Sequence, residues 1–336
     1  MADPYLFTSE SVAEGHPDKI ADRIADAILD RHLTGDPDSR VAAEALITDN
    51  FLVLAGEIAS QSSVDYEQVA KEVIRSIGYG DKNNGFDLEN AEIITRIHEQ
   101  SPDIARGVTG QEIGAGDQGV MFGYAVNETP HLMPLTLELA HKLTNGLKAL
   151  RKSTPWLRPD GKAQVTALYD KKGKPVEVKT VLLSAQHDEN VDSETVRKTL
   201  EAMIREKIGE SWLSDDVRIL INPTGRFVKG GPAADTGLTG RKLIVDTYGG
   251  RAHHGGGALS GKDGTKVDRS GAYAARYIAK HIVAAGITPE CEVMLAYAIG
   301  VAEPISLKIN TFGYYDGEKK LAEKVLETFP VKPGAI

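Results

Sequence analysis

The sequence predicts an α+β protein made of three pseudo-repeats of β-α-β-β-α-β, each a two-layer unit of one sheet under two helices. Three observations carry this prediction. The chain has 336 residues, more than one hydrophobic core usually supports. Segments with helical and with alternating hydrophobic spacing recur in the same order three times. The first hairpin strands of the three copies begin roughly 120–130 residues apart, which is the size of a domain and not of a solenoid repeat.

The first copy is expected to run strand, helix, hairpin, helix, strand. Its first helix begins near Pro17, where Ile20, Ile24 and Ile28 share one face. The pair Asp49-Asn50 favours a tight turn between two apolar runs. The expected elements are a strand at Tyr5–Phe7, the helix from Pro17, hairpin strands Val41–Ile47 and Phe51–Ala59, a helix at Val64–Ile77 and a strand at Glu92–Glu99.

The other two copies repeat this order. The second is expected to contain a strand Val120–Val126, a helix Leu135–Leu150, hairpin strands Gln164–Tyr169 and Val176–Ser184, a helix Glu194–Ile208 and a strand Val217–Asn222. The third is expected to contain a strand Leu243–Tyr248, a helix Arg269–Ala285, hairpin strands Glu292–Ile299 and Ser306–Phe312, and a helix Glu318–Phe329, without a closing strand before Ile336. The predicted domains are residues 1–101, 114–232 and 233–336.

One hairpin is apolar on both faces. Leu52, Val53 and Leu54 are consecutive, so residues on both sides of that strand are hydrophobic. Strands of this kind are normally covered on both faces. Because the two helices of the repeat cover only one face, we expect a second subunit on the other and hence a homo-oligomer.

Composition and charge exclude several classes of function. The net charge of −9 and the pI of about 5.6 argue against a nucleic-acid surface, which needs a broad basic stripe. No apolar run approaches the roughly 18–20 residues of a membrane helix, and no basic start precedes an apolar segment. Cys291 is the only cysteine, so no intrachain disulfide can form. These features favour a cytoplasmic protein that binds neither nucleic acid nor membrane.

Two glycine motifs imitate known nucleotide-binding loops. Residues 114–119 read GAGDQG, but the strand-like VMFGYAV follows where a dinucleotide fingerprint must open a helix. Residues 256–263 read GGALSGKD, where Asp263 replaces the hydroxyl of a phosphate loop and the next helix begins only after Val267. The sequence therefore argues against both a dinucleotide-binding fold and a P-loop fold. Glycines still let backbone N–H groups approach phosphate oxygens, and Lys262 adds a positive charge.

Two aspartates stand at the expected starts of equivalent helices. Asp268 follows a glycine-rich segment that also holds Lys262 and Lys266, and Asp18 lies in the motif GHPDK. A lone acid at a helix start is often only a partner of the helix dipole. In company with lysines, however, such carboxylates suit Mg²⁺ bound to phosphate oxygens. His16 precedes its helix in a loop with little reason to be buried.

Further polar residues occur near glycines in the segments between repeats. Lys162 lies in RPDGK, Arg226 in NPTGRF, and Arg241 and Lys242 in GLTGRK. Any one of these cations alone is more often a surface residue. Their place beside glycines in an acidic chain favours anion binding. Four loop or strand-end residues are candidates for contacts to an amine, a carboxylate or a ribose: Glu57, Gln100, Asp117 and Asp235.

The motifs GHPDK, GAGDQGVMFGY, NPTGRF, GLTGRK and GGGALSGKD–KVDRS together resemble, in this order, those of the methionine adenosyltransferase (S-adenosylmethionine synthetase) family. The resemblance covers residues 1–336. It implies three intertwined αβ repeats in a homodimer, or a dimer of dimers, with sites between subunits. Leu259 stands where the family loop usually has Phe. Family chains also usually continue through a further helix and strand, which matches the absent closing strand of the third repeat.

The resemblance implies a role for each motif residue. The substrates would be ATP and L-methionine, and the cofactors Mg²⁺, two per site, and K⁺. ATP would contact His16, Asp160, Lys162, Arg226, Phe227, Asp235, Arg241, Lys242, Ala258 and Lys262. Methionine would contact Glu57, Gln100, Asp117, Asp235, Lys266 and Ile299. Asp18 and Asp268 would bind Mg²⁺ and Glu44 would bind K⁺. The catalytic residues would be His16, Lys162, Arg241 and Lys262.

The implied reaction is attack of the methionine sulfur on C5′ of ATP, with release of triphosphate that is then cleaved to pyrophosphate and phosphate. A thioether carries no proton, so no general base is needed, and no Ser/His/Asp or Cys/His constellation is evident. Stabilising the charge of the leaving triphosphate is the main requirement. Three alternatives stay open: a non-catalytic relative, a phosphotransferase and a plain Mg²⁺-dependent triphosphatase.

Overall fold

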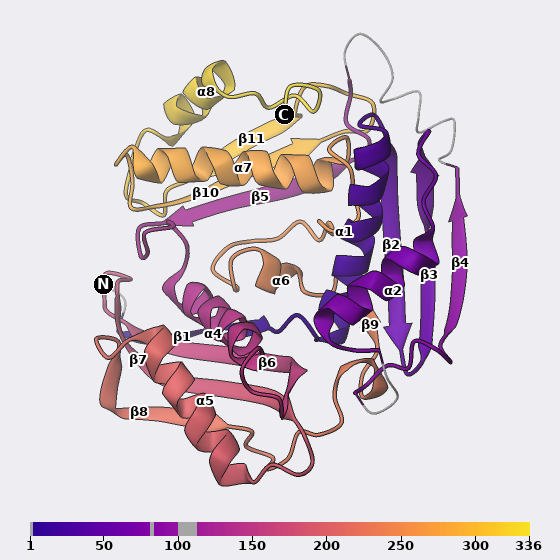
Figure 1. Cartoon of the computed structure of the whole chain (residues 1–336). Coiled ribbons are helices and arrows are strands. Elements are labelled where there is room, and N and C mark those ends of the chain that lie inside the picture. The colour runs from indigo at the N-terminus through magenta and orange to yellow at the C-terminus, as the bar shows by residue number, and fades with distance from the viewer. Residues whose placement is uncertain (1–2, 81–83, 100–112) are drawn as a thin grey trace.

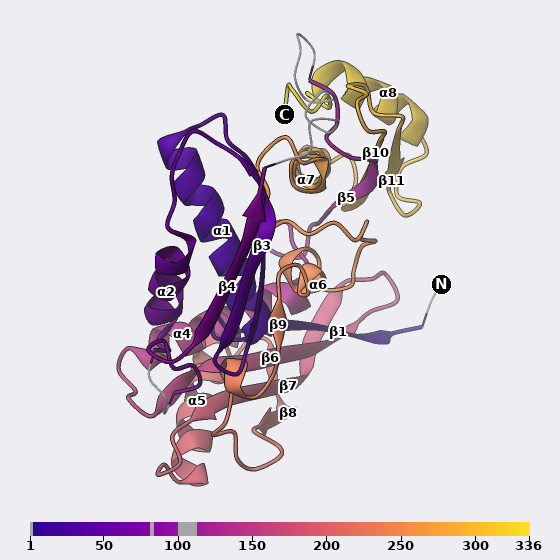
Figure 2. The same cartoon turned by 90° about the vertical axis from the view of Figure 1, so that its right-hand side faces the viewer.

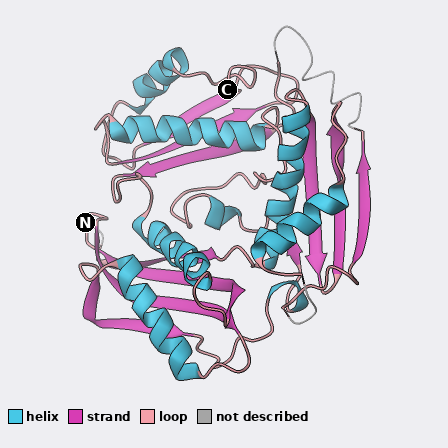
Figure 3. Cartoon of the chain, in the orientation of Figure 1, coloured by secondary structure: helices cyan, strands magenta, loops and turns pink. Residues whose placement is uncertain are grey.

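The computed structural model describes residues 3–80, 84–99 and 113–336. It consists of three α+β units, each with a sheet covered on one face by two helices (Figures 1 and 3). The short helix α6 lies near the middle of the three units in both views (Figures 1 and 2). No helix among the described residues is long and apolar enough to cross a membrane.

The elements follow the expected order along the chain. The first repeat contains β1 (Tyr5–Val12), α1 (Pro17–Gly35), β2 (Arg40–Thr48), β3 (Phe51–Ala59), α2 (Tyr66–Ile77) and β4 (Glu92–His98). The second contains β5 (Gly119–Val126), α4 (Leu135–Arg151), β6 (Leu157–Tyr169), β7 (Pro175–His187), α5 (Ser193–Ile208) and β8 (Leu213–Ile221). The third contains the 3₁₀ turn η1 (Gly231–Ala233), β9 (Gly237–Leu238), α6 (Leu243–Asp246), α7 (Val267–Ala284), β10 (Glu290–Tyr297), β11 (Ser306–Asn310) and α8 (Glu318–Thr328).

The first strand of each repeat belongs to the sheet of another repeat. The three sheets have the orders β4-β3-β2-β9, β1-β6-β7-β8 and β11-β10-β5. Thus β1 joins the central unit, β5 joins the third and β9 joins the first. This cyclic exchange confirms the intertwined arrangement, and it corrects the simpler expectation that each copy builds a sheet from its own strands alone.

Several expected elements differ from the structure. The predicted strand Leu243–Tyr248 is wrong, because its first part forms helix α6 and the short β9 occupies the strand position instead. The short β9 pairs with the edge of β2, and an ideal Cβ on Gly237 would lie 2.1 Å from the backbone of Pro17, so a residue with a side chain would not fit at that position between α1 and β2. Strands β6 and β7 are longer than predicted, so Asp160 and Lys162 lie in a strand and not in a loop.

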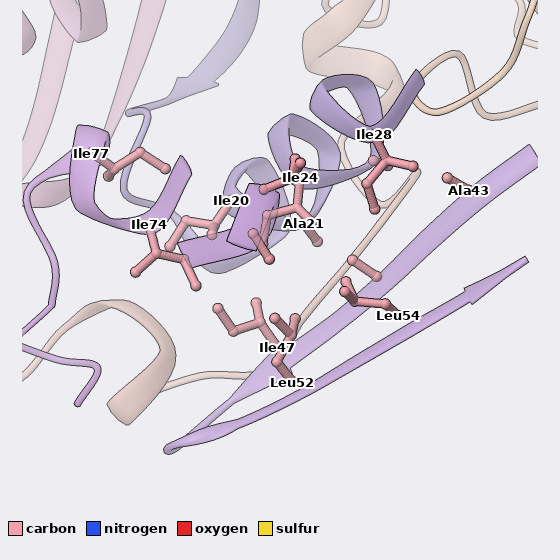
Figure 4. Close-up of a cluster of buried hydrophobic side chains, with 14 of the residues drawn as sticks. Ile20, Ala21, Ile24, Ile28, Ala43, Ile47, Leu52, Leu54, Ile74 and Ile77 are labelled. Carbon is pink, nitrogen blue, oxygen red and sulfur yellow. The ribbon is translucent and has the colours of Figure 1, made fainter. Parts of the chain in front are cut away.

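The hydrophobic core of the first unit lies between its helices and sheet. Ile20, Ile24 and Ile28 of α1 are fully buried against Ile47 and Leu54 of the hairpin, as Figure 4 shows. The other face of the same sheet, formed by alternate residues such as Leu46 and Val53, remains partly exposed in the single chain. The expected second subunit on that face therefore stays a prediction.

Candidate active site

The glycine–lysine loop, residues 255–266 between α6 and α7, contacts the edge of β2. The Ala43 N–H donates to the Gly261 carbonyl (2.9 Å), and the Asp263 N–H donates to the Val41 carbonyl (3.1 Å). Gly261 has a φ of +75°, and an ideal Cβ there would lie 2.2 Å from the Ala43 oxygen. Glycine at this position therefore allows close contact with protein backbone, and not only with a phosphate as its motif suggests.

Asp263, the residue that argued against a phosphate loop, has a structural role. Its side chain is almost fully buried and accepts the Val41 N–H (2.7 Å), the Thr265 hydroxyl (2.6 Å) and the Lys266 ammonium (2.8 Å). Burial alone would raise the pKa of this carboxyl, but the charge and the hydrogen bond of Lys266 outweigh it and lower the pKa. Asp263 thus anchors the loop to β2 and holds Lys266 at its end.

Strand register places a row of polar groups on the outer face of the first sheet. Ala42 pairs with Lys262 on one side and with Glu57 of β3 on the other, and Glu57 pairs with His98 of β4. The His98 Nε2 lies 3.5 Å from a Glu57 oxygen. His98 carried no signal in the sequence, because only the parallel register of β3 and β4 brings it beside Glu57.

This row forms one wall of a cavity of about 480 Å³, here called the Lys262 pocket. Across from it lies the start of α7, where the Lys262 Nζ is 2.5 Å from Asp268 Oδ2. Asp268 stands within the first turn of α7, whereas the sequence suggested a place just before the helix. The pocket is lined by Ala42, Glu57, His98, Glu99, Gly116, Asp117, Lys262, Lys266, Val267 and Asp268.

A second group surrounds the start of α1 and is here called the His16 cluster. It comprises His16, Asp18, Asp160, Lys162, Asp235, Arg241 and Lys242. His16 is the N-cap of α1, and only 2% of it is exposed, which corrects the expectation that it lies in an open loop. The strand exchange explains the burial: beyond β1 the chain follows β6, with the Gly15 N–H donating to the Pro159 carbonyl at 3.2 Å.

The ring of His16 is a hydrogen-bond donor at neutral pH. Burial and the charges of Lys242 and Lys162 lower the pKa of His16 to about 4, so the ring is uncharged at pH 7. Its Nδ1 accepts the Asp18 N–H at 3.2 Å. The proton of the neutral ring is therefore on Nε2, which can donate to an acceptor on a ligand.

Asp18 joins α1 to β9 and to the segment that follows β9. Its carboxylate accepts the Leu238 N–H (3.0 Å), pairs with the Lys242 ammonium and lies 3.6 Å from Arg241 Nε. Burial alone would raise the pKa of Asp18, but the hydrogen bonds from Lys242 and Leu238 and the charge of Lys242 outweigh burial and lower the pKa. The carboxylate is consequently ionised, although only 1% of the residue is exposed.

Asp160 is the opposite case in the same cluster. It is buried on β6, and its Oδ2 accepts the Gly231 N–H at 2.9 Å. Burial raises its pKa to about 6, against the lowering effect of that hydrogen bond and of Lys162. Lys162 itself is exposed two residues along the strand, in register with Val12 of β1. A buried anion beside exposed cations suits a ligand that has both donors and negative charge.

Some of the remaining predicted residues lie next to the His16 cluster or the Lys262 pocket, and others do not. Ala258 packs against Gly240, next to Arg241, and Ile299 pairs with Ala115, two residues before Asp117. Arg226 is exposed and pairs with Glu189 at 3.1 Å, and the Phe227 N–H faces His187. The structure joins neither Arg226 nor Phe227 to the two groups by a contact. Glu44 is exposed on the outer sheet face, and Gln100 lies outside the described residues.

The structure does not bring the two predicted Mg²⁺ ligands together within one chain. Asp18 belongs to the His16 cluster and Asp268 to the Lys262 pocket, and no group of three His, Cys, Asp or Glu residues that suits a metal occurs in residues 3–80, 84–99 and 113–336. Mg²⁺ commonly binds one or two carboxylates together with substrate phosphates. Separate carboxylates therefore fit an ion that is held jointly with a phosphate ligand.

Comparison with known proteins covers almost the whole chain. Residues 4–102, 112–227 and 229–336 match the models of the S-adenosylmethionine synthetase N-terminal, central and C-terminal domains, respectively. The S-adenosylmethionine synthase of Desulforudis audaxviator (strain MP104C) is 53% identical, with 99% of this chain and 88% of that protein covered. That of Thermosynechococcus vestitus (strain NIES-2133 / IAM M-273 / BP-1) is 51% identical, with 99% and 86% covered. The chain therefore belongs to the S-adenosylmethionine synthetase family.

Proposed function

We propose that this chain is a methionine adenosyltransferase that forms S-adenosyl-L-methionine from ATP and L-methionine. The sulfur of methionine attacks C5′ of ATP, the C5′–O bond breaks, and triphosphate leaves and is then cleaved to pyrophosphate and phosphate. The observation that carries this proposal is a buried, uncharged His16 close to the cations Lys242 and Lys162, in a chain that also holds a lysine-lined pocket of about 480 Å³.

The residues of the His16 cluster suit a charged leaving group. The triphosphate that departs carries about four negative charges, and preorganised donors lower the barrier by stabilising that charge. Lys162, Arg241 and Lys242 supply fixed positive charge, and the Nε2–H of His16 supplies a neutral donor for the departing oxygen. A neutral donor suits this role, because it stabilises the departing oxygen through a hydrogen bond and no proton transfer is required.

The ion pairs between predicted metal ligands and predicted phosphate ligands support a role for Mg²⁺. Lys242 pairs with Asp18 and Lys262 with Asp268, so each predicted metal ligand neutralises a predicted phosphate ligand. Asp18 and Asp268 would hold two Mg²⁺ ions per site, and the lysines would then be free to contact phosphate. When bound, Mg²⁺ neutralises charge on the triphosphate oxygens. Glu44, which has no side-chain hydrogen bond or ion pair among the described residues, would hold K⁺.

Methionine is assigned to the Lys262 pocket. Glu57 and Asp117 offer carboxylates for its ammonium group, and Lys266 offers a cation for its carboxylate. Ile299 would contact its side chain from the adjoining loop, and Gln100 would act from outside the described residues. Asp235, on the His16 side, would contact both substrates, and Ala258, Arg226 and Phe227 would contact the nucleotide.

The arrangement favours a complete site made from two chains, in a homodimer or a dimer of dimers. The lining of the Lys262 pocket includes no member of the His16 cluster. Asp18 and Asp26 of α1, which contact the two groups, are eight residues apart, or about 12 Å along the helix. The partly exposed outer face of the first sheet, beside the pocket, offers a place for the partner.

The activity is tested by incubating the protein with ATP, L-methionine, Mg²⁺ and K⁺. Formation of S-adenosylmethionine with equimolar phosphate and pyrophosphate supports the proposal. Triphosphate cleavage without a sulfonium product would identify a triphosphatase instead. Phosphate transfer to an acceptor would identify a phosphotransferase, and the absence of any turnover would favour a non-catalytic relative.

The two-chain site is tested by mixing inactive variants. His16→Ala and Lys262→Ala chains are unfolded together, refolded and assayed. If each site takes His16 from one chain and Lys262 from the other, half of the dimers are mixed and each mixed dimer has one intact site, giving about a quarter of wild-type activity. Sites within single chains would give no activity beyond that of the two parents.

A further inference from the structure

Three aspartates form a stripe along α1 and hold two segments of the third repeat. Asp18, Asp22 and Asp26 are four residues apart and therefore lie on one side of the helix. Asp18 Oδ1 accepts the Leu238 N–H (3.0 Å), Asp22 Oδ1 accepts the Gly240 N–H (2.9 Å) and Asp26 Oδ1 accepts the Gly261 N–H (3.0 Å). The stripe thus contacts both segments that carry the predicted phosphate ligands.

Asp26 acts together with Arg269 of α7. The Arg269 guanidinium donates to Asp26 Oδ1 (2.9 Å) and, with the same nitrogen, to the carbonyl of Lys262 (3.2 Å). The backbone around Lys262 is therefore held on this side at the N–H of Gly261 and at the carbonyl of Lys262. On the other side it is held by β2, through the Gly261 carbonyl and the N–H of the residue after Lys262.

The consequence concerns the direction of the Lys262 side chain. A lysine has four rotatable bonds, so its ammonium is well placed only if its own backbone is fixed. Arg269 follows Asp268 directly on α7, so the same guanidinium links the Lys262 backbone to the helix that carries its ion-pair partner. Arg269 binds Lys262 at its backbone carbonyl, Asp26 binds the N–H of the preceding Gly261, and neither Asp26 nor Arg269 lines the Lys262 pocket.

We propose that Asp26 and Arg269 are positioning residues that hold Lys262 in its working geometry. The proposal deepens the proposed function, on which it rests, since it concerns the ammonium that meets the triphosphate. A displacement of about 1 Å in such a group costs up to roughly 100-fold in rate. Asp26→Ala should therefore lower kcat by roughly 10- to 100-fold and change the KM for methionine much less.

Two variants serve as matched controls. Asp26→Asn keeps an oxygen acceptor for the Gly261 N–H and loses only the charge, so it should recover a large part of the rate. Asp30→Ala removes an aspartate one turn further along the same stripe, where the side chain has no hydrogen bond or ion pair with any described residue. Its kcat should stay within twofold of wild type, and a loss equal to that of Asp26→Ala would overturn the proposal.

The decisive experiment is a double-mutant cycle with Lys262. Lys262→Ala should lower kcat by roughly 100-fold or more, as for loss of one preorganised donor. If Asp26 acts through Lys262, adding Asp26→Ala to Lys262→Ala changes kcat by less than about twofold. If the two losses multiply, Asp26 has another role and the proposal is wrong. Arg269→Met provides the same cycle should Asp26→Ala fail to fold.

A binding measurement separates this proposal from the proposed function. Affinity for inorganic tripolyphosphate with Mg²⁺ is measured by calorimetry for wild type, Asp26→Ala, Lys262→Ala and the double variant. Asp26→Ala should weaken binding several-fold in the wild-type background and have no further effect without Lys262. This readout does not depend on sulfonium formation: wild-type protein that makes no S-adenosylmethionine contradicts the proposed function, whereas additive losses in binding contradict the positioning role.

Discussion

Asp160 and His16 should impose opposite pH dependences on the stability of the ligand-free protein. Both are almost fully buried in the same cluster, but one is a carboxyl whose pKa is raised and the other an imidazole whose pKa is lowered. The perturbation is the pair of single substitutions Asp160→Asn and His16→Asn. Each removes one titrating group, so that the pH dependence due to the other is no longer opposed.

For Asp160 the folded pKa of about 6 lies above the usual 3.8. The folded protein therefore holds the proton more tightly than the unfolded chain, and stability falls as pH rises through this range. Two pKa units correspond to about 3 kcal/mol at pH 8, of which about 2 kcal/mol develops between pH 4.5 and 8. Asp160→Asn removes this loss of stability, because an amide does not titrate. The amide oxygen can still accept the Gly231 N–H.

For His16 the folded pKa of about 4 lies below the usual 6.5. The unfolded chain takes up the proton first, so stability is complete above pH 6.5 and is lost as pH falls toward 4. The loss reaches about 2.5 kcal/mol at pH 4.5. His16→Asn removes it, so the variant gains on wild type as the pH falls, opposite in sign to Asp160→Asn.

The measurement is the unfolding free energy by urea from pH 4.5 to 8, at constant protein concentration because assembly, where it occurs, makes stability depend on concentration. For each variant, the difference in unfolding free energy from wild type is followed as a function of pH. Only the change in this difference is interpreted, because a cost of the substitution that does not depend on pH then cancels. Asp160→Asn should gain about 2 kcal/mol on wild type from pH 4.5 to 8, and His16→Asn should lose a similar amount. Differences that stay flat within about 1 kcal/mol would refute the reasoning about burial.

Two further predictions concern the residues that hold the units together and the loop in place. The Arg251 side chain is only 8% exposed, lies 3.1 Å from the buried carboxylate of Glu128 and lies over the rings of Phe7 and Tyr169. Arg251→Ala should cost about 3–5 kcal/mol of unfolding free energy, because it leaves the buried charge of Glu128 without its cation. Arg226→Ala, which breaks an exposed ion pair, should cost less than about 1 kcal/mol, and equal losses in urea unfolding would contradict this account. Gly261→Ala should lower kcat at least about tenfold, because the φ of +75° and the nearby carbonyl of β2 force the loop to move. Gly264→Ala, where a Cβ meets nothing within 4 Å, should retain near wild-type kcat in the same assay.

Much of the fold could be predicted, because its signals are local. The helix that starts at Pro17 and the hairpin at Asp49-Asn50 follow from hydrophobic spacing and turn residues, and both are confirmed. The strand expected at Leu243 is wrong, because a short apolar run of Leu, Ile and Val fits a strand or a short helix equally well, and the edge of β2 is paired with other segments. That edge is occupied by β9 and the glycine–lysine loop. The spacing of hydrophobic residues within a segment does not report such a long-range contact.

The site residues, like the elements of the fold, include some that local sequence signals predicted and some that depend on long-range contacts. Motifs predicted residue types that meet in space, such as Asp18 with Lys242 and Lys262 with Asp268. They did not predict His98, whose place beside Glu57 depends on parallel register, nor Asp26, whose spacing on an amphipathic helix looks like that of any exposed acid. The burial of His16 was also missed, because the strand that covers it comes from another repeat.

The cyclic strand exchange gives a physical reason for where the motifs stand. GHPDK follows β1, GAGDQG leads into β5, and GLTGRK begins with β9, so a motif adjoins every exchanged strand. A strand that crosses to another unit carries the residues at its ends to a junction between units. The exchange of β1 brings Gly15, which precedes His16, to Pro159, which precedes Asp160, and that of β9 brings Lys242 to Asp18, 224 residues earlier in the chain. In a protein whose repeats kept their own strands, the same motifs would end at separate sheet edges, so the intertwining itself assembles the charged groups.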